Sequence, residues 1–115
     1  MSFELRLASG AVGDFRLIYR HLYESHRSFG ETGADARLRA TRRTVDIRLR
    51  AQALASHPYR GQRDDAVWPG LRHVTIDRAV YYFQIDEARA VVTVLGVFLA
   101  GQDHRRRMLT RLLSR

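Results

Sequence analysis

Residues 71–99 read LRHVTIDRAVYYFQIDEARAVVTVLGVFL, and this stretch decides the fold. It divides into three runs rich in β-branched and aromatic residues, which predict three strands: Leu71–Ile76, Ala79–Ile85 and Val91–Leu99. The connections at 77–78 and 86–90 are short enough to make both turns hairpins, so an antiparallel meander is expected. The last run is continuously apolar, which is typical of a central strand covered on both faces.

Two helices are predicted upstream of the meander. From Ala11 to about Ser28, apolar residues recur at helical spacing on a face that leaves Asp14 outside: Val12, Phe15, Ile18, Tyr19 and Leu22. A second helix begins after Thr32, whose side chain suits an N-cap, and ends at His57-Pro58, because the residue before a proline is pushed out of the helical region. Its expected buried stripe is Leu38, Val45, Leu49 and Ala53, flanked by Ala36, Ala40, Ile47 and Leu54. The short connection makes the two helices antiparallel neighbours.

The remaining segments complete the expected architecture. Phe3, Leu5 and Leu7 alternate with other residues and predict an N-terminal strand, whereas 59–70 has no usable period and reads as a loop. A final helix is expected from Gln102 to about Leu113, with Met108, Leu109, Leu112 and Leu113 as its apolar stripe. The order β-α-α-β-β-β-α predicts a single two-layer α+β domain over residues 1–115. Its helical hairpin packs on an antiparallel sheet that the N-terminal strand completes.

Composition narrows the class of protein. The chain of 115 residues has no cysteine, which excludes disulfides and thiolate metal sites. No apolar run approaches the roughly 20 residues needed to cross a bilayer. The N-terminus lacks the basic-then-apolar order of a secretory signal, so a soluble cytoplasmic protein is expected. No pair of histidines has a metal-ligand spacing, and we expect neither a metal nor another cofactor.

Charge is the unusual feature. All 20 basic residues are arginine and the net charge is +8, which favours a polyanionic or acidic partner. A GC-rich genome could account for the absence of lysine but not for the excess charge. One arginine group, residues 37–50, suits a solvated helix face. The other, residues 104–115, has five arginines and no acid, so each close pair on the last helix costs a few tenths of a kcal/mol. We expect packing or an acidic partner to hold that helix.

Five short motifs follow one another along the chain: Ala11, Asp14, Phe15, Ile18 and Leu22; Pro58, Arg60-Gly61 and Arg63-Asp64; Gly70-Leu71-Arg72; Val80–Phe83; and Val94–Phe98 followed by Gly101–Asp103. Together they resemble the RelE/ParE superfamily of toxins from type II toxin–antitoxin pairs, and its ParE branch most. The resemblance spans nearly the whole chain and implies a poison that a small cognate antitoxin neutralises. ParE-like members act on DNA gyrase, whereas RelE-like members cut messenger RNA on the ribosome.

The leading interpretation is a non-catalytic ParE-like inhibitor of DNA gyrase. Its antitoxin is expected to carry an acidic segment that folds on binding. Direct nucleic-acid binding is a secondary expectation, and no membrane partner is expected. Two alternatives stay open: a ribosome-dependent mRNA endonuclease, and an inactive toxin-derived module that only binds its partner.

The endonuclease alternative can be tested against the residues present. Cleavage at a 2′-hydroxyl needs a base, cations and an acid. Arg72 matches an arginine that RelE-like enzymes carry on the second strand, and His104 could supply the acid or base. However, 99–102 lacks the His-Arg expected there, and no tyrosine follows Phe83. The preferred interpretation of His104 is a solvated residue in the first turn of the last helix, and that of His73 is a packing residue on a strand.

The gyrase interpretation assigns different residues. Target-binding charges are expected at Arg105, Arg106, Arg107 and Arg111. The segment 81–83 must point aromatic side chains to both faces of the sheet, so one of them faces the last helix or an antitoxin segment. The residues expected to bind the antitoxin are Tyr81, Phe83, Met108 and Leu112. Trp68 is expected to anchor its loop to the core.

Overall fold

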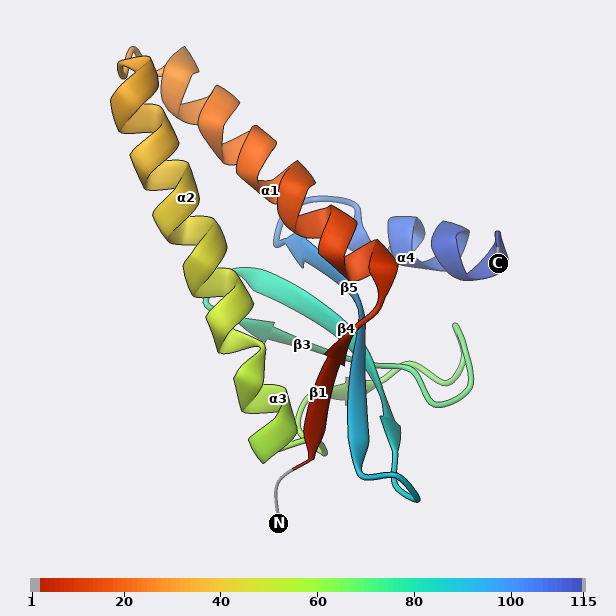
Figure 1. The fold of residues 1–115 in the computed structure, drawn as a ribbon. Coiled ribbons are helices and arrows are strands. Elements are labelled where there is room, and N and C mark those ends of the chain that lie inside the picture. Colours follow the sequence, from red (N-terminus) through yellow and green to blue (C-terminus); the bar gives the residue numbers. More distant parts are fainter. Residues whose placement is uncertain (1–2, 115) are drawn as a thin grey trace.

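The computed structural model describes residues 3–114 as a helical hairpin lying against one face of a five-stranded sheet, with a short helix on the other face (Figure 1). The elements are β1 (Glu4–Leu7), α1 (Ser9–Ser28), α2 (Gly33–Arg50), α3 (Gln52–Ser56), β2 (Gln62–Arg63), β3 (Arg72–Ile76), β4 (Ala79–Asp86), β5 (Val91–Leu99) and α4 (His104–Leu113). The predicted α+β order is confirmed. Two features are additional: α3 is separated from α2, and the predicted loop contains the short strand β2.

The sheet has the order β1-β5-β4-β3-β2, so β5 is an interior strand paired with β1 on one side and β4 on the other, as its continuous apolar run indicates. β3, β4 and β5 form the predicted antiparallel meander, but β1 pairs parallel with β5, which makes the sheet mixed. The direction follows from the hairpin. α1 and α2 carry the chain away and back, so β3 starts at the same end as β1, and two further reversals leave β5 parallel to it.

The turn between β3 and β4 has the backbone that a two-residue hairpin requires. Asp77 and Arg78 have φ of 46° and 67°, both in the left-handed region that type I′ turns use. From α2, the Arg43 guanidinium donates to the Asp77 carbonyl and to its carboxylate. This contact ties the helical hairpin to the end of the meander.

The buried face of α2 differs from the predicted stripe. Leu38, Val45 and Leu49 are 48%, 49% and 69% exposed, so the prediction that they pack on the core is wrong for the isolated chain. The buried residues are the predicted flank: Ala36, Ala40 and Ile47. The helix has two apolar faces, and the small alanines allow α1 and the sheet to approach more closely than leucines would.

The predicted helix from Gly33 to His57 is interrupted at Ala51. The buried Tyr81 hydroxyl donates to the Ile47 carbonyl at 2.6 Å, and the Ala51 N–H bonds instead to the Arg48 carbonyl at 3.2 Å. A tyrosine from the sheet thus takes the acceptor that the next helical turn would use. The predicted ends are confirmed, because Thr32 caps the Asp35 N–H at 3.1 Å and His57 ends α3.

The aromatic run of β4 divides between the two faces, as predicted. Tyr81 and Phe83 are fully buried in the cluster beneath the helical hairpin, whereas Tyr82 lies in the cluster beneath α4. Trp68 packs against this second cluster, which confirms its role as a loop anchor. Tyr81 and Phe83 have no exposed surface in this structure, and their role in antitoxin binding stays a prediction.

Candidate functional site

α4 is seated on the sheet by two apolar side chains and one glycine. Met108 and Leu112 are buried, whereas the other half of the predicted stripe, Leu109 and Leu113, is exposed. A Cβ atom at Gly96 of β5 would lie 2.8 Å from the Met108 sulfur, a distance that real Cβ atoms do not show. The glycine therefore allows α4 to approach the centre of the sheet.

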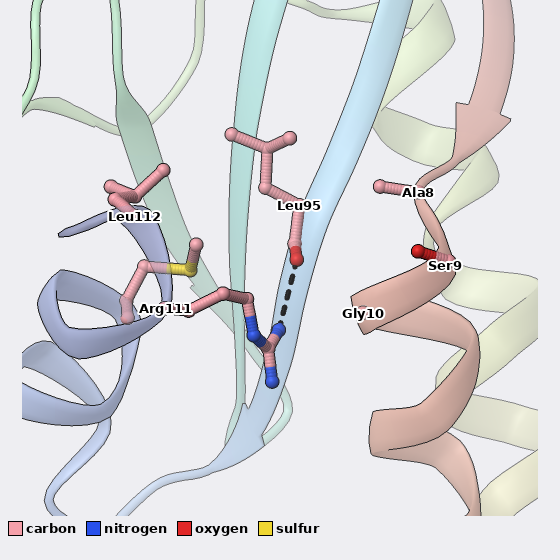
Figure 2. A pocket seen from close by; sticks show the side chains of 7 residues that line it. Ala8, Ser9, Gly10, Leu95, Arg111 and Leu112 are labelled. Atoms are coloured by element: carbon pink, nitrogen blue, oxygen red, sulfur yellow. Dashed lines mark hydrogen bonds between the residues drawn. The ribbon is translucent and has the colours of Figure 1, made fainter. Parts of the chain in front are cut away.

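An ion pair between a buried carboxylate and a partly exposed guanidinium fixes the C-terminal half of α4. The Arg111 guanidinium donates to both carboxylate oxygens of Asp14, at 2.7 and 2.8 Å, and to the Leu95 carbonyl at 3.0 Å. Asp14 is only 2% exposed and also accepts the Val97 N–H at 2.9 Å. In Figure 2 the guanidinium reaches from α4 to the Leu95 carbonyl, in a pocket also lined by Ser9 and Gly10 at the start of α1.

This arrangement corrects two expectations. Asp14 is expected outside the buried face of α1, but it lies inside the protein, because a charged partner from the other end of the chain accompanies it. Arg111 is expected among the target-binding charges, but in this structure its guanidinium binds Asp14 and the Leu95 carbonyl of β5. The hydrogen bonds with Asp14 raise the pKa of Arg111 above its ordinary value.

The other three expected target-binding arginines are exposed. Arg105, Arg106 and Arg107 occupy the first turn and a half of α4, where no acidic residue is present. Arg107 lies over the Phe98 ring, 4.9 Å from its centroid, and donates to the Gln102 side chain at 3.1 Å. A helix N-terminus carries partial positive charge, so these cations stand at the less favourable end of α4. The arrangement would favour an anionic group beside them.

A cluster of four polar side chains lies between α4 and the sheet. His104, the first residue of α4, has its Nδ1 2.8 Å from the Tyr82 hydroxyl. His73 on β3 contacts the Asp64 carboxylate through its own Nδ1. The two imidazole centroids are 6.4 Å apart, and His73 lies 5.3 Å from the Tyr82 ring. Sequence reasoning named the histidines only singly. The short hairpin between β3 and β4 places His73 opposite Tyr82, so the sequence could predict that one contact, but it identifies neither Asp64 nor the contact with α4.

Protonation in this cluster is set by burial. Burial raises the pKa of Tyr82 to about 12, so the phenol keeps its proton. Burial, followed by the neighbouring His73, lowers the pKa of His104. The hydrogen bond between the Tyr82 hydroxyl and His104 Nδ1 orients the imidazole, and in the neutral tautomer that carries its proton on Nε2 the phenol is the donor.

The expected endonuclease pair is not brought together. Arg72 lies opposite Phe83 on β3 and therefore projects toward the hairpin side of the sheet, whereas His73 lies opposite Tyr82 on the α4 side. The Arg72 guanidinium donates to the Tyr59 carbonyl at 3.2 Å and stands over the Tyr59 ring. Arg72 and His104 consequently belong to opposite faces of the sheet.

A basic groove runs between α1 and α2. Its lining includes Arg16, Arg20, Arg37 and Arg48, together with Tyr19, Tyr23, Val12 and Val45, and contains no acidic residue. The exposed Leu38 and Leu49 lie on the same helix as Val45 and extend the apolar surface beside the groove. Sequence reasoning missed this surface because it assigned Tyr19 and Val45 to the core.

Two further observations concern residues 3–114. None of their helices has the length and apolar character that crossing a membrane requires. No group of three or more histidine, aspartate or glutamate side chains within this part of the chain could hold a metal ion.

Comparison with known proteins gave matches among solved structures, whereas no family model and no curated sequence matches. The chain is similar to a chromosomal ParDE toxin–antitoxin structure from P. aeruginosa, with a TM-score of 0.64, 17% identity, and coverage of 86% of this chain and 97% of that one. It is also similar to the RelBE2 toxin–antitoxin complex from Mycobacterium tuberculosis, with a TM-score of 0.60, 14% identity, and coverage of 89% of this chain and 95% of that one. A free mutant of the E. coli toxin RelE matches with a TM-score of 0.53, 12% identity, and coverage of 98% of this chain and 99% of that one. The chain therefore has the RelE/ParE toxin fold, as the sequence motifs implied.

Proposed function

We propose that this chain is the toxin of a type II toxin–antitoxin pair, that it inhibits DNA gyrase without catalysis, and that a cognate antitoxin neutralises it. The observation that carries the proposal is the construction of α4. Its C-terminal half is fixed by the pair of Arg111 with the buried Asp14, and its N-terminal half presents three exposed arginines. Such a helix supports docking on an anionic surface, for which no proton transfer is needed.

Electrostatics favour a target that contributes negative charge. Arginines at the positive end of a helix repel both one another and the helix dipole, and an anionic partner offsets both costs. DNA held by gyrase would supply such a surface. Exposed charges of this kind act mainly on the rate of association, and each can partly replace another.

The groove between α1 and α2 supports the proposal that an antitoxin binds this chain. Four arginines without an acid suit an acidic segment, and the exposed Leu38, Val45 and Leu49 suit apolar anchors at helical spacing. The proposed antitoxin surface is therefore the outside of the hairpin rather than Tyr81 and Phe83. Met108 and Leu112 would contact a partner only if its segment took the place of α4 on the sheet.

The test is to measure gyrase supercoiling and cleaved-complex formation with the purified chain, in parallel with ribosome-dependent mRNA cleavage. We expect inhibition of gyrase and no cleavage of mRNA. Single alanine changes at the three exposed arginines should weaken inhibition gradually and the triple change should abolish it. The matched control replaces all three with lysine, which keeps the charge and should retain most of the inhibition. A chain that leaves gyrase unaffected but cleaves mRNA on ribosomes would refute the proposal.

The endonuclease remains a second candidate because one observation favours it. Tyr82 orients His104, Asp64 contacts His73, and both imidazoles lie on one face of the sheet beside Arg105. One imidazole would take the 2′-hydroxyl proton while the other gives a proton to the leaving 5′-oxygen. In that case His104→Ala should lower the rate about 10²- to 10⁴-fold, whereas an inhibitor should be little affected. This candidate stands second because His73, Tyr82 and Asp64 are largely covered.

A further inference from the structure

α4 is attached to the rest of the protein by different chemistry at its two ends. Near its C-terminus, Arg111 pairs with Asp14, and a guanidinium stays charged at any ordinary pH. At its N-terminus the polar attachment is the hydrogen bond between the Tyr82 hydroxyl and His104 Nδ1. An imidazole changes its charge between pH 5 and 8, so only this end can respond to mild acid.

We propose that His104 makes the attachment of α4 dependent on pH: protonation of His104 releases the first turn of α4 from the sheet, while the Arg111 end stays bound. The hydrogen bond gives the first reason. In the neutral tautomer with its proton on Nε2, His104 accepts a hydrogen bond at Nδ1 from the buried Tyr82 hydroxyl, whereas the imidazolium carries a proton on Nδ1 and cannot accept one there. The phenol would have to turn its O–H away within a covered site, where a donor without an acceptor is unfavourable.

The charges around His104 give the second reason. On α4 itself it adjoins Arg105 and the positive end of the helix, and Asp103 precedes it; from β3 it faces His73, from β4 the neutral phenol of Tyr82, and from the preceding loop Asp64. The two carboxylates favour the imidazolium, but Asp64 is already in contact with His73. The effects of burial, His73 and Arg105 on the imidazole outweigh those of the two carboxylates, so the pKa of His104 is lowered from its ordinary value of 6.5.

The direction of the effect follows from this shift. When the first turn is released, His104 meets water and regains a pKa near the ordinary 6.5, so the released form binds the proton more tightly than the docked form. By linkage, the docked turn is fully favoured above that pH, and the balance moves toward release as the pH falls below it. Arg105, Arg106 and Arg107 lie on or next to the released turn, so on the proposed function, inhibition of gyrase would weaken in acid.

The test uses the full chain and does not depend on its toxicity. Hydrogen exchange would be measured between pH 5 and 8, corrected for the intrinsic rate of each amide. We expect the protection of residues 107–109 to fall as the pH drops below 6.5, while the amides of α1 keep theirs. Trp68 is the only tryptophan and packs against the cluster beneath α4, so its fluorescence should follow the same transition.

Two substitutions assign the transition to one imidazole. His104→Gln cannot be protonated and should make the protection of α4 independent of pH, whereas His21→Gln, an exposed control on α1, should leave the transition unchanged. A transition that persists in His104→Gln, or that disappears in His73→Gln but not in His104→Gln, overturns the proposal. The wild-type imidazole resonances provide a check without substitution, because the His104 titration must coincide with the loss of protection. Failure to inhibit gyrase would leave these measurements unaffected.

Discussion

Removing the guanidinium of Arg111 should destabilise the fold far more than removing any other arginine of α4. Arg111→Met keeps an aliphatic side chain and deletes the guanidinium, with its charge, its hydrogen bonds and its contact with the Phe98 ring, 5.5 Å from the ring centroid. Asp14, 2% exposed, would then keep a single described donor, the Val97 N–H. Breaking a buried pair by removing one partner costs roughly 3–5 kcal/mol. We expect about 3 kcal/mol, the lower end of that range, because the Arg111 side chain is itself 30% exposed.

The assay is urea unfolding at pH 7, followed by Trp68 fluorescence. The matched control is Arg106→Met on the same helix, which is exposed and makes no ion pair with any residue from 3 to 114, so its effect should stay within about 0.5 kcal/mol. Asp14→Asn added to Arg111→Met should restore part of the lost stability, because it removes the stranded charge and still accepts the Val97 N–H. Equal effects of the two arginine variants, or further loss in the double variant, would refute the reasoning.

Four further outcomes are expected. Val45→Asp should weaken binding of the proposed antitoxin by tenfold or more, about 1.4 kcal/mol in calorimetry, without changing the urea midpoint of the free chain, because this side chain is 49% exposed. Tyr81→Phe should cost about 1 kcal/mol in unfolding free energy, since it removes the buried hydrogen bond to α2. Gly96→Ala should cost about 1–3 kcal/mol in the same assay by forcing α4 away from β5. Stability should also decline as the pH falls below 6.5, through the lowered pKa of His104, and His104→Gln should reduce that slope in urea titrations.

The sequence predicts part of the candidate site, the exposed arginines, but not the polar cluster beneath α4. The arginine run 105–107 was visible because it is contiguous, and the structure leaves it exposed. The polar cluster beneath α4 was not, because Asp64, His73 and His104 come from three segments that no sequence period connects. Arg72 matched its motif, yet the register of β3 with β4 places it on the opposite face from His104. A motif identifies a residue by its position along the chain, whereas a site depends on which face of the sheet that residue occupies.

The sequence by itself determined the features that depend on neighbouring residues. The apolar run Val91–Leu99 became β5 with the predicted bounds, the pair 77–78 made the tight turn, and Thr32 capped α2. Each of these depends on the local backbone and on side chains a few positions apart, so the same residues specify the same element in most surroundings.

Only the tertiary structure decided which surfaces meet. α2 has two apolar faces, and close packing of Ala36 and Ala40 selected one of them and left Leu38 and Val45 outside. Asp14 appears polar and exposed in the sequence, but Arg111, 97 residues away, makes its burial possible. A charge is buried only where a partner meets it, and that partner is found only after the sheet has brought the two ends of the chain together.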